Sequence, residues 1–400
     1  MYFFATGAAP EMQSLGHDAG GWIRRAWNMR PIIQASNCDL LFRLPYVGRW
    51  ESVSCNTDIQ FGEEDEVLEI QFAAPKEVKF VSKQRTKLKP GQIRIKSLCS
   101  LISSGTELKI FAGSFDSAAL DVNIKNMEGQ RMEYPLSYGY SLVGRVVECG
   151  EKVEAETFMG KNVFTFSAHA TEAVAEAKAV HLIPDGVDPY DAIFMPSVET
   201  ALSIVHDAHP RLGEKILVLG QGLIGLLVTH LLSKVSPELG RPSLTTVDAF
   251  PERLAFSTLL GSQQAVLPSE VSLCEAFDVA IEVSGNFRAL QSAIDCTRNG
   301  GRVIIASWYG NKPCTLKLGI EFHRSHKTIR TSQVSELPSE LREAWTKQRR
   351  FELTWDLLRA LRPSRLLTRV ARPEDAAEVY EELLRGDQVS VAFDYAGSQD

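Results

Sequence analysis

A glycine-rich turn at residues 220–225 constrains the fold of this 400-residue chain more than any other feature. It follows residues 215–219, an apolar run without alternation that is typical of a strand buried on both faces. It leads into residues 223–233, where apolar side chains recur at helical spacing. A buried strand, a tight turn with three glycines and an apolar helix form the unit that binds dinucleotides in doubly wound sheets. The turn therefore predicts an α/β fold with a parallel sheet.

Each glycine of the turn has its own physical role in such a unit. Gly220 permits the tight turn, and Gly222 lets the backbone approach a pyrophosphate. Gly225 lets the helix pack closely against the strand. Leu223 and Ile224 begin the helix, whose free N–H groups and partial positive charge attract phosphates. We therefore expect these five residues to contact the cofactor.

The next predicted strand ends on an acid, Asp248, 23 residues after Gly225. Its carboxylate is expected to accept hydrogen bonds from the adenosine ribose hydroxyls and to repel a 2′-phosphate, which favours NAD over NADP. Arg253 follows within two helical turns and could offset part of that repulsion, so NADP stays open as the less favoured cofactor. A structural turn that binds nothing is a weaker alternative, because the strand before the turn, the helix after it and the acid on the next strand all fit a dinucleotide site.

The flanking patterns complete the predicted architecture. Residues 277–283 and 301–306 are two more buried-type strands, and helical segments separate the strands, which indicates βαβ units. Residues 66–164 carry short β runs closed by glycines at irregular spacing, which is typical of a compact β barrel. The tail predicts helices at residues 341–361 and 373–384, and then a last strand at residues 389–393.

Composition narrows the class of protein. The net charge of −7 argues against a nucleic-acid partner. The seven cysteines are scattered without a CxxC pair, so we expect reduced thiols rather than a disulfide framework. No apolar run reaches the roughly 18–20 residues of a membrane span, and the start lacks the basic region of a secretory signal. These features predict a protein of the cytoplasm or an organellar matrix that is not secreted.

Residues 1–65 show no steady period and are expected to be an extension of uncertain order. The first fifty residues hold five arginines and three acids. An arginine-rich, acid-poor start is a weak indication of an organellar transit peptide, so a plastid stays open as a location. A simple N-terminal extension is the favoured alternative.

Four segments together carry a resemblance to a known family: residues 104–113, 135–148, 220–225 and 281–286. From about Glu66 to Gly397 the chain resembles the medium-chain dehydrogenase/reductase superfamily, which includes the zinc alcohol dehydrogenases. The resemblance implies a GroES-like β-barrel catalytic domain and an inserted Rossmann domain with a doubly wound parallel sheet. The implied boundaries are 66–198 for the first part of the catalytic domain, 199–340 for the Rossmann domain and 341–400 for the return to the catalytic domain.

The chain departs from the zinc members of that family at each ligand position. Ser104 stands where they have a cysteine, and Tyr140 stands where they have a histidine. Their third ligand would fall near Met195 and Pro196, and none of these four side chains is a good zinc ligand. No cysteine occurs at residues 113–134, where a structural zinc loop would lie. We therefore expect no zinc.

Two histidine pairs could be considered as replacement ligands. His206 and His209, like His323 and His326, are three residues apart. Neither pair has a well-placed third ligand, so packing or surface roles are favoured.

The Ser-Gly-Thr-Glu motif at residues 104–107 and the Gly-Tyr motif at residues 139–140 resemble those of a zinc-free branch of the superfamily, similar to bacteriochlorophyllide a dehydrogenase. Members of that branch oxidise a hydroxyethyl group on a chlorin ring with NAD.

Without zinc, a hydrogen-bond donor has to manage the hydroxyl proton and the developing oxyanion. Tyr140 is the first catalytic candidate, because a phenol can act as a general acid. Thr106 holds the family's hydroxyl-relay position, and Ser104 and Glu107 are close enough in sequence to orient that relay. Tyr140 could instead have a buried packing role. For Glu107 a structural role is favoured over the catalytic one. His169 could face the cleft, but a core role is favoured.

Further residues are expected on the cofactor side. Ser284 and Gly285 should lie at the C-terminal edge of the sheet, beside the cofactor. Thr200 begins the helix that leads into the Rossmann domain and is placed toward the nicotinamide. The basic run at residues 347–350 is interpreted as a solvated helix face, with an anionic-substrate site as the less favoured alternative.

Three functions remain open from the sequence. The first is a zinc-independent NAD(H)-dependent oxidoreductase that interconverts an alcohol and a carbonyl, on a chlorin-type or other bulky small-molecule substrate. The second is a quinone or enoyl reductase that uses NADPH. The third is a catalytically silent NAD-binding protein. A homodimer is compatible with all three.

Overall fold

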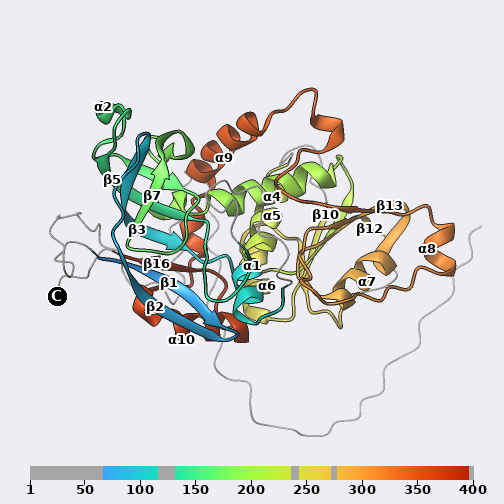
Figure 1. Cartoon of the computed structure of the whole chain (residues 1–400). Coiled ribbons are helices and arrows are strands. Elements are labelled where there is room, and N and C mark those ends of the chain that lie inside the picture. The colour runs from blue at the N-terminus through green and yellow to red at the C-terminus, as the bar shows by residue number, and fades with distance from the viewer. Residues whose placement is uncertain (1–65, 116–130, 236–242, 272–276, 396–400) are drawn as a thin grey trace, which may run out of the picture. The chain divides into compact units, whose positions relative to one another are not determined.

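The computed structural model describes residues 66–115, 131–235, 243–271 and 277–395 (Figure 1). These residues belong to one compact unit. The extension predicted for residues 1–65 lies outside the described residues. Within the described ranges, no helix has the length and apolar character needed to cross a membrane.

Six strands form a parallel sheet in the order β11-β10-β9-β12-β13-β14. The first strand of this sheet in chain order, β9, lies inside the sheet; β10 and β11 add on one side of it, and β12, β13 and β14 then add on the other. This reversal of strand order creates a switch point, and ligands of such sheets bind at the carboxyl ends of the strands there. The six strands are β9 (Lys215–Leu219), β10 (Ser243–Val247), β11 (Gln264–Val266), β12 (Phe277–Glu282), β13 (Thr297–Ile305) and β14 (Thr328–Thr331).

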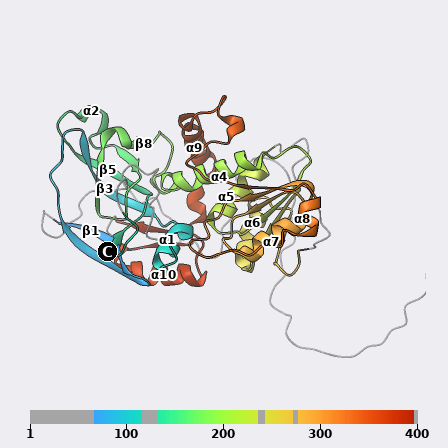
Figure 2. The same cartoon turned by 45° about the vertical axis from the view of Figure 1, so that its right-hand side comes forward.

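Helices cover both faces of this sheet, as alternate residues of β9 show (Figures 1 and 2). Ile216 and Val218 pack in one core with α4 and α5, whereas Leu217 and Leu219 pack in another core with α7. A strand buried on both faces has no polar alternation, which is why residues 215–219 read as a continuous apolar run. The helices of this part are α4 (Met195–Ala208), α5 (Leu223–Lys234), α6 (Pro251–Leu259), α7 (Phe287–Cys296) and α8 (Ile320–Arg324).

The remaining strands form two mainly antiparallel sheets. One has the order β15-β16-β3-β5-β6-β8 with β7 also on β3, and the other has the order β2-β1-β4. The last strand pairs with β3, so the end of the chain returns to a sheet begun more than 290 residues earlier. The fold class predicted from the sequence, an α/β protein with a β-rich part and a doubly wound parallel sheet, is confirmed. These strands are β1 (Glu66–Ala74), β2 (Glu77–Gln84), β3 (Gln92–Leu101), β4 (Leu136–Ser137), β5 (Leu142–Cys149), β6 (Asn162–Thr165), β7 (Glu172–Glu176), β8 (His181–Leu182), β15 (Arg369–Ala371) and β16 (Val391–Asp394).

Aromatic side chains join the first helix to the C-terminal helix α10. The Tyr380 ring lies 5.1 Å from the Phe72 ring and 5.6 Å from the Phe111 ring, centroid to centroid. All three rings are almost fully buried, so this cluster fixes the base of the helix that carries the catalytic candidates. The helices of this part are α1 (Ser104–Phe111), α2 (Ala155–Phe158), α3 (Pro189–Ala192), α9 (Lys347–Leu361) and α10 (Ala376–Arg385).

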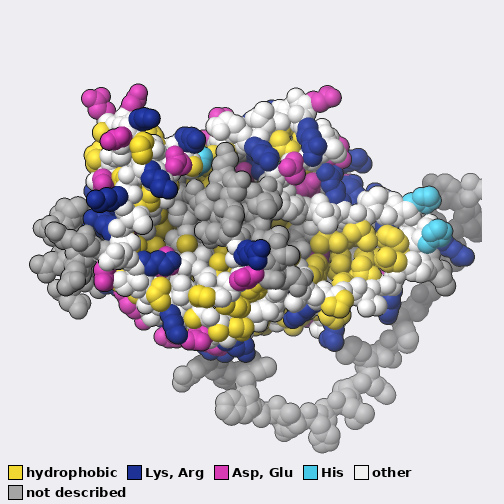
Figure 3. All heavy atoms as spheres, viewed as in Figure 1, with side chains coloured by type: hydrophobic (Ala, Val, Ile, Leu, Met, Phe, Trp, Pro, Cys, Tyr) yellow, Lys and Arg dark blue, Asp and Glu magenta, His cyan; other side chains and the backbone are white. Residues whose placement is uncertain are grey.

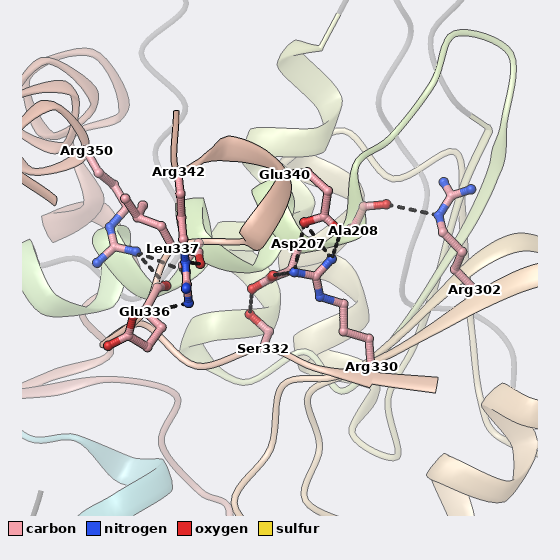
Figure 4. A network of polar contacts seen from close by, with 11 residues as sticks. Asp207, Ala208, Arg302, Arg330, Ser332, Glu336, Leu337, Glu340, Arg342 and Arg350 are labelled. Carbon is pink, nitrogen blue, oxygen red and sulfur yellow. Dashed lines mark hydrogen bonds and ion pairs between the residues drawn. The ribbon is translucent and has the colours of Figure 1, made fainter. Parts of the chain in front are cut away.

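A polar network ties α4 to residues 330–350 (Figure 4). The Arg350 guanidinium is 2% exposed, pairs with Glu199 at 3.0 Å, and donates to the carbonyls of Val334 and Glu336. The interpretation of residues 347–350 as a solvated face is therefore wrong for Arg350, which is buried. A buried arginine that bonds several acceptors holds the segment against α4, and the hydrophobic pattern of the sequence does not reveal those acceptors.

Helix α9 begins six residues later than the predicted helix at 341–361. Residues Ser339–Leu341 form a separate short 3₁₀ turn, and the Thr346 side chain accepts a hydrogen bond of 3.0 Å from the Arg349 N–H. A threonine with extended backbone that bonds the third helical N–H is a favourable N-cap, so the helix starts there.

Replacing this cap gives a modest stability prediction. Thr346→Ala should lower the free energy of unfolding by about 1 kcal/mol, because one helix N–H loses its acceptor. Thr346→Ser keeps the acceptor and should stay close to the parent. Chemical denaturation measures both, and equal losses in the two variants would show that the cap is not the cause.

Candidate functional site

The glycine turn has the geometry that its three glycines predict. Gly220 has a φ of +102°, and a β-carbon there would lie 2.7 Å from the Ser284 Cα. A β-carbon on Gly225 would lie 2.0 Å from the carbonyl oxygen of Gly220. A β-carbon on Gly222 would meet no atom of the described residues within 4 Å. Two glycines are thus required by packing, and the middle one faces open space.

The Gln221 side chain holds the start of α5 in place. The buried Gln221 side chain donates to the Gly220 carbonyl at 2.9 Å and accepts from the Thr229 hydroxyl at 3.0 Å. Gly222 is the N-cap and has no side chain with which to satisfy the first helical N–H groups. The helix N-terminus therefore directs unsatisfied donors and its dipole toward the open space beside Gly222.

Asp248 lies directly beyond β10 and bonds this same turn. Its Oδ2 accepts from the Gln221 N–H at 2.6 Å, and its Oδ1 accepts from the Phe250 N–H at 2.9 Å. The residue is 8% exposed. Since each carboxylate oxygen can accept more than one hydrogen bond, the two backbone donors orient the group and leave it able to accept further hydroxyls.

Arg253 has a different environment from the one expected of a phosphate-binding residue. Its guanidinium lies 4.5 Å above the Phe250 ring and donates to the carbonyls of Gly386 and Gln388, at 3.3 and 3.4 Å. Its Nε is buried without a hydrogen-bond partner among the described residues. The side chain thus links α6 to the end of α10 and the residues that follow it.

Ser284 and Gly285 follow β12 at the same edge of the sheet, and Glu282 organises them. This fully buried carboxylate accepts from the N–H and hydroxyl of Ser284, at 2.7 and 2.6 Å, and from the Gly285 N–H at 3.0 Å. The Tyr309 hydroxyl also donates to it, and burial, together with that carboxylate, raises the pKa of Tyr309. The sequence reasoning missed Glu282, although an acid at the end of an apolar strand was a usable signal.

Two hydroxyl groups meet at the position of the predicted catalytic residues. The Tyr140 hydroxyl is hydrogen-bonded to the side chain of Ser103, the residue that precedes α1. Ser104 and Thr106 lie on the first turn of α1 and are half-buried. The sequence reasoning singled out Ser104 and missed its neighbour Ser103. Helical periodicity cannot decide which of two adjacent serines faces a tyrosine on another segment.

Glu107, on the first turn of α1, is buried and is hydrogen-bonded to the backbone of Ser103. Its Oε1 accepts from the Ser103 N–H at 2.7 Å, and its Oε2 bonds His169 Nε2 at 3.0 Å. The Tyr380 hydroxyl donates to the same Oε2. Burial, followed by the nearby Glu107 charge, raises the pKa of Tyr380 well above its ordinary value. Glu107 therefore links α1, the segment around His169 and α10.

Thr200 does not begin the helix as expected: α4 starts five residues earlier, at Met195, and Thr200 lies within it and is half-buried. None of the hydrogen bonds found between described residues involves its hydroxyl. The structure thus places it on the helix that leads into the parallel sheet.

The residues at the family's zinc positions do not fit the metal. Met195 and Pro196 are buried at the start of α4, and Ser141 donates to the Ile193 carbonyl. Among the residues that the structure describes, no cluster of three or more histidines, cysteines or acids could hold a metal ion. Serine and tyrosine hydroxyls, methionine and proline are not the ligand set of protein-bound zinc.

The histidine pair on α4 has a packing environment. The His206 ring lies 4.6 Å from the Trp345 ring, and burial, followed by the charge of Arg350, lowers the pKa of His206 to about 4. His209 ends the helix in the left-handed conformation and is exposed. A ring packed on tryptophan and an exposed C-cap do not converge on one point.

Comparison by sequence finds dehydrogenases, while no family model matches the chain. The L-threonine 3-dehydrogenase of Anaeromyxobacter dehalogenans is 27% identical over 230 residues, which cover 46% of this chain and 64% of that protein. The D-guloside 3-dehydrogenase of Escherichia coli is 25% identical over 232 residues, covering 55% and 65%. The chain therefore matches slightly less than two thirds of the length of these relatives.

Comparison by structure finds alcohol dehydrogenases. The 2R,3R-butanediol dehydrogenase of Bacillus subtilis has a TM-score of 0.65 at 20% identity, with 82% of this chain and 99% of that chain covered. Two further neighbours carry cofactors. A dehydrogenase from Sinorhizobium meliloti, described as zinc-binding, holds NADP (TM-score 0.65, 16% identity, 83% and 100% covered). The acetophenone reductase of Geotrichum candidum holds NAD (0.66, 16%, 84% and 98%).

These likenesses bear differently on the expectations from the sequence. The relatives and neighbours are alcohol, polyol and threonine dehydrogenases, so they support the superfamily resemblance, whereas they do not support the narrower zinc-free branch. The structural neighbours named above are at most 20% identical to this chain, so they show its fold alone. The chain has the fold of the medium-chain alcohol dehydrogenases, a GroES-like β domain joined to a Rossmann domain.

Proposed function

We propose that this chain is an NAD(H)-dependent oxidoreductase that interconverts an alcohol and a carbonyl without zinc. The observation that carries the proposal is the open space at the start of α5. It is bordered by Gly222, whose β-carbon position no described residue fills, and it lies beside the fixed carboxylate of Asp248. A glycine turn with free helical donors next to an acid is suited to a pyrophosphate and a ribose.

The cofactor would supply the hydride acceptor or donor. The α5 N-terminus would hold the pyrophosphate, and Asp248 would accept from the ribose hydroxyls. Ser284 and Gly285 would border the nicotinamide half, because they lie at the carboxyl edge of the same sheet and Glu282 fixes their backbone.

Tyr140 would manage the substrate oxygen. In the direction of reduction, its phenol O–H donates a hydrogen bond to the carbonyl and transfers its proton to the oxygen as the alcohol forms. The Ser103 hydroxyl, bonded to the Tyr140 oxygen, can then donate to the phenolate until solvent returns the proton. The donor set at the family's zinc positions does not fit zinc, which supports a metal-free site of this kind.

The substrate class is proposed on two grounds. The relatives are named for alcohol-bearing substrates, which supports an alcohol or carbonyl here. Figure 3 shows hydrophobic side chains gathered over α7 and the neighbouring strands. Phe287, the first residue of α7, and Trp308, three residues after β13, are 46% and 44% exposed and follow Gly285 and Ser307 closely in sequence. An apolar surface near the cofactor edge favours a bulky substrate, a chlorin-type ring included.

Two alternatives have weaker support. A quinone or enoyl reductase with NADPH would need a cation near the 2′-phosphate, and Arg253 is instead engaged by two backbone carbonyls. The NADP in one neighbour is the observation that favours this alternative. A silent NAD-binding protein would need neither the Tyr140–Ser103 pair nor the buried carboxylate beneath it.

Asp248 gives a prediction for cofactor choice. Asp248→Asn should weaken NAD binding by about tenfold or more, because hydrogen bonds to a charged acceptor contribute about 1.5–3 kcal/mol. The same change should narrow the preference for NAD over NADP, since the repulsion of a 2′-phosphate is lost. Calorimetric titration with both cofactors measures this. An unchanged NAD affinity would place the ribose elsewhere.

The activity itself is tested by turnover. The full chain is assayed with NAD and NADP on alcohols, ketones, quinones and hydroxyethyl chlorins. We expect NAD-linked oxidation of at least one alcohol or reduction of one ketone. NADPH-linked turnover of quinones alone would favour the second function. Tight NAD binding without turnover of any compound would favour the silent protein.

A further inference from the structure

His169 is the centre of a buried chain of polar groups, and none of the steps proposed above uses it. The residue is fully buried. Its Nδ1 lies 2.7 Å from the Ser100 Oγ, and its Nε2 lies 3.0 Å from the Glu107 Oε2. The Ser100 Oγ in turn lies 3.0 Å from the Tyr395 hydroxyl. Both ring nitrogens are therefore engaged.

One arrangement of hydrogens satisfies every member of this chain. Tyr395 donates to Ser100, Ser100 donates to Nδ1 of the ring, and Nε2–H donates to Glu107. Glu107 then accepts three hydrogen bonds, the other two from the Ser103 N–H and the Tyr380 hydroxyl. A carboxylate with three donors is fixed in rotation as well as in position.

The same histidine also contacts the backbone next to Tyr140. Gly139 has a φ of +131°, and a β-carbon there would lie 2.8 Å from the Cδ2 of His169. The imidazole ring thus occupies the space that a side chain at position 139 would need. It supports the peptide that precedes Tyr140 by direct packing.

Tyr140 is therefore fixed along two routes that start at one residue. One route runs from His169 through Gly139 to the backbone of Tyr140. The other runs from His169 through Glu107 to Ser103, whose hydroxyl bonds the phenol. A proton donor works only within hydrogen-bond reach of the reacting oxygen, so its placement affects the rate directly.

The cost of this arrangement argues against simple packing. Burying a carboxylate and an imidazole carries a desolvation penalty, and well-packed apolar residues of similar size are often as stable or more so. His169 and Glu107 are connected to the Tyr140 hydroxyl through Ser103, and His169 also packs on Gly139. We therefore expect the buried pair to serve catalysis, which would explain why its desolvation penalty is tolerated.

We propose that His169 is a positioning residue that sets the orientation of the Tyr140 phenol, through Glu107 and Ser103 on one side and Gly139 on the other. The inference rests on the proposed role of Tyr140 and extends it to residues that touch neither substrate nor cofactor. Ser100 and Glu107 bond the histidine directly, and Tyr395 and Tyr380 bond these two residues in turn. Glu107 transmits the effect to Ser103.

A double-mutant cycle in the full chain tests the proposal. His169→Gln is measured alone and together with Tyr140→Phe, and kcat, KM and NADH affinity are recorded for each. We expect about a tenfold or larger fall in kcat when Tyr140 is present, with NADH affinity unchanged. With phenylalanine at position 140 the fall should shrink to less than about twofold, because no phenol remains to be oriented. Equal falls in the two backgrounds would overturn the proposal.

A second readout does not depend on turnover. Fluorotyrosine is placed at position 140, and its fluorine NMR resonance is recorded. His169→Gln and Ser100→Ala should both shift or broaden this resonance. The Ser100 variant adds no volume and covers the case in which the histidine variant fails to fold. His181→Gln is the matched control, since His181 packs on Phe351 with ring centroids 4.2 Å apart and lies outside the network.

The outcomes separate the two claims. An unchanged resonance in folded Ser100→Ala and His169→Gln protein would overturn the positioning role, even if the enzyme is active. A resonance that responds in a protein without any turnover would support the positioning role and would count against the proposed activity. A response of equal size in His181→Gln would also overturn the proposal, because the effect would then not be specific to the network.

Discussion

Tyr140→Phe is expected to lower kcat by about a hundredfold or more, with NADH affinity close to that of the parent. Removing one phenol oxygen takes away the group that donates to the substrate oxygen, and general acid catalysis typically contributes 10²–10⁴-fold. The cofactor contacts lie on the parallel sheet, so they should be unaffected. Stopped-flow or steady-state turnover on the best substrate, together with a NADH fluorescence titration, measures the two effects separately.

Tyr134→Phe is the matched control for this change. The Tyr134 hydroxyl donates to the Ile110 carbonyl at the end of α1, so its removal disturbs the same helix without removing the catalytic donor. We expect its kcat to stay within about threefold of the parent. If both phenylalanine variants lose activity equally, the loss at Tyr140 would be structural, and another group would have to supply the proton.

Gly225→Ala is expected to remove most of the cofactor binding and to destabilise the fold. The new β-carbon would lie 2.0 Å from the carbonyl oxygen of Gly220, which is backbone and cannot turn aside. Helix α5 must therefore move away from the turn, which costs about 1–3 kcal/mol or more and displaces the donors from the pyrophosphate. NADH affinity should fall by more than about a hundredfold, since two or more hydrogen bonds to a charged group are lost.

Gly222→Ala separates binding from folding in the same turn. A β-carbon there meets no described atom within 4 Å, so stability should hardly change. NADH affinity should still fall, because the methyl group would occupy the space assigned to the pyrophosphate. Gly319→Ala, also free of contacts within 4 Å among the described residues, should leave both properties as they are. Full NADH affinity in Gly222→Ala would move the cofactor away from this turn.

The fold was predictable because its strongest signals are local. A strand buried on both faces, three glycines and the start of an apolar helix lie within twenty residues of one another. Their backbone requirements do not depend on distant contacts. The β-rich part could be predicted as a class for the same reason, whereas its division into two sheets depends on pairings between distant strands.

The site was predictable only in part, because its contacts are long-range. Glu107 and Tyr380 are 273 residues apart, and no periodicity connects them. His169 could be considered a core histidine from the sequence, yet its partners Ser100 and Glu107 could not be identified. Arg350 is a second example. A basic run predicts exposed side chains, and nothing in it indicates the distant carbonyls that accept hydrogen bonds from the buried Arg350 guanidinium.

Metal content measured alongside activity shows whether this site works without zinc. The purified full chain is analysed for bound metals, treated with a strong chelator, and assayed again with NAD and its best substrate. We expect less than about one tenth of a zinc ion per chain and unchanged turnover after chelation, because the residues at the ligand positions are not those that hold zinc. One zinc ion per chain, with activity lost on its removal and restored on its return, would show instead that the site depends on zinc.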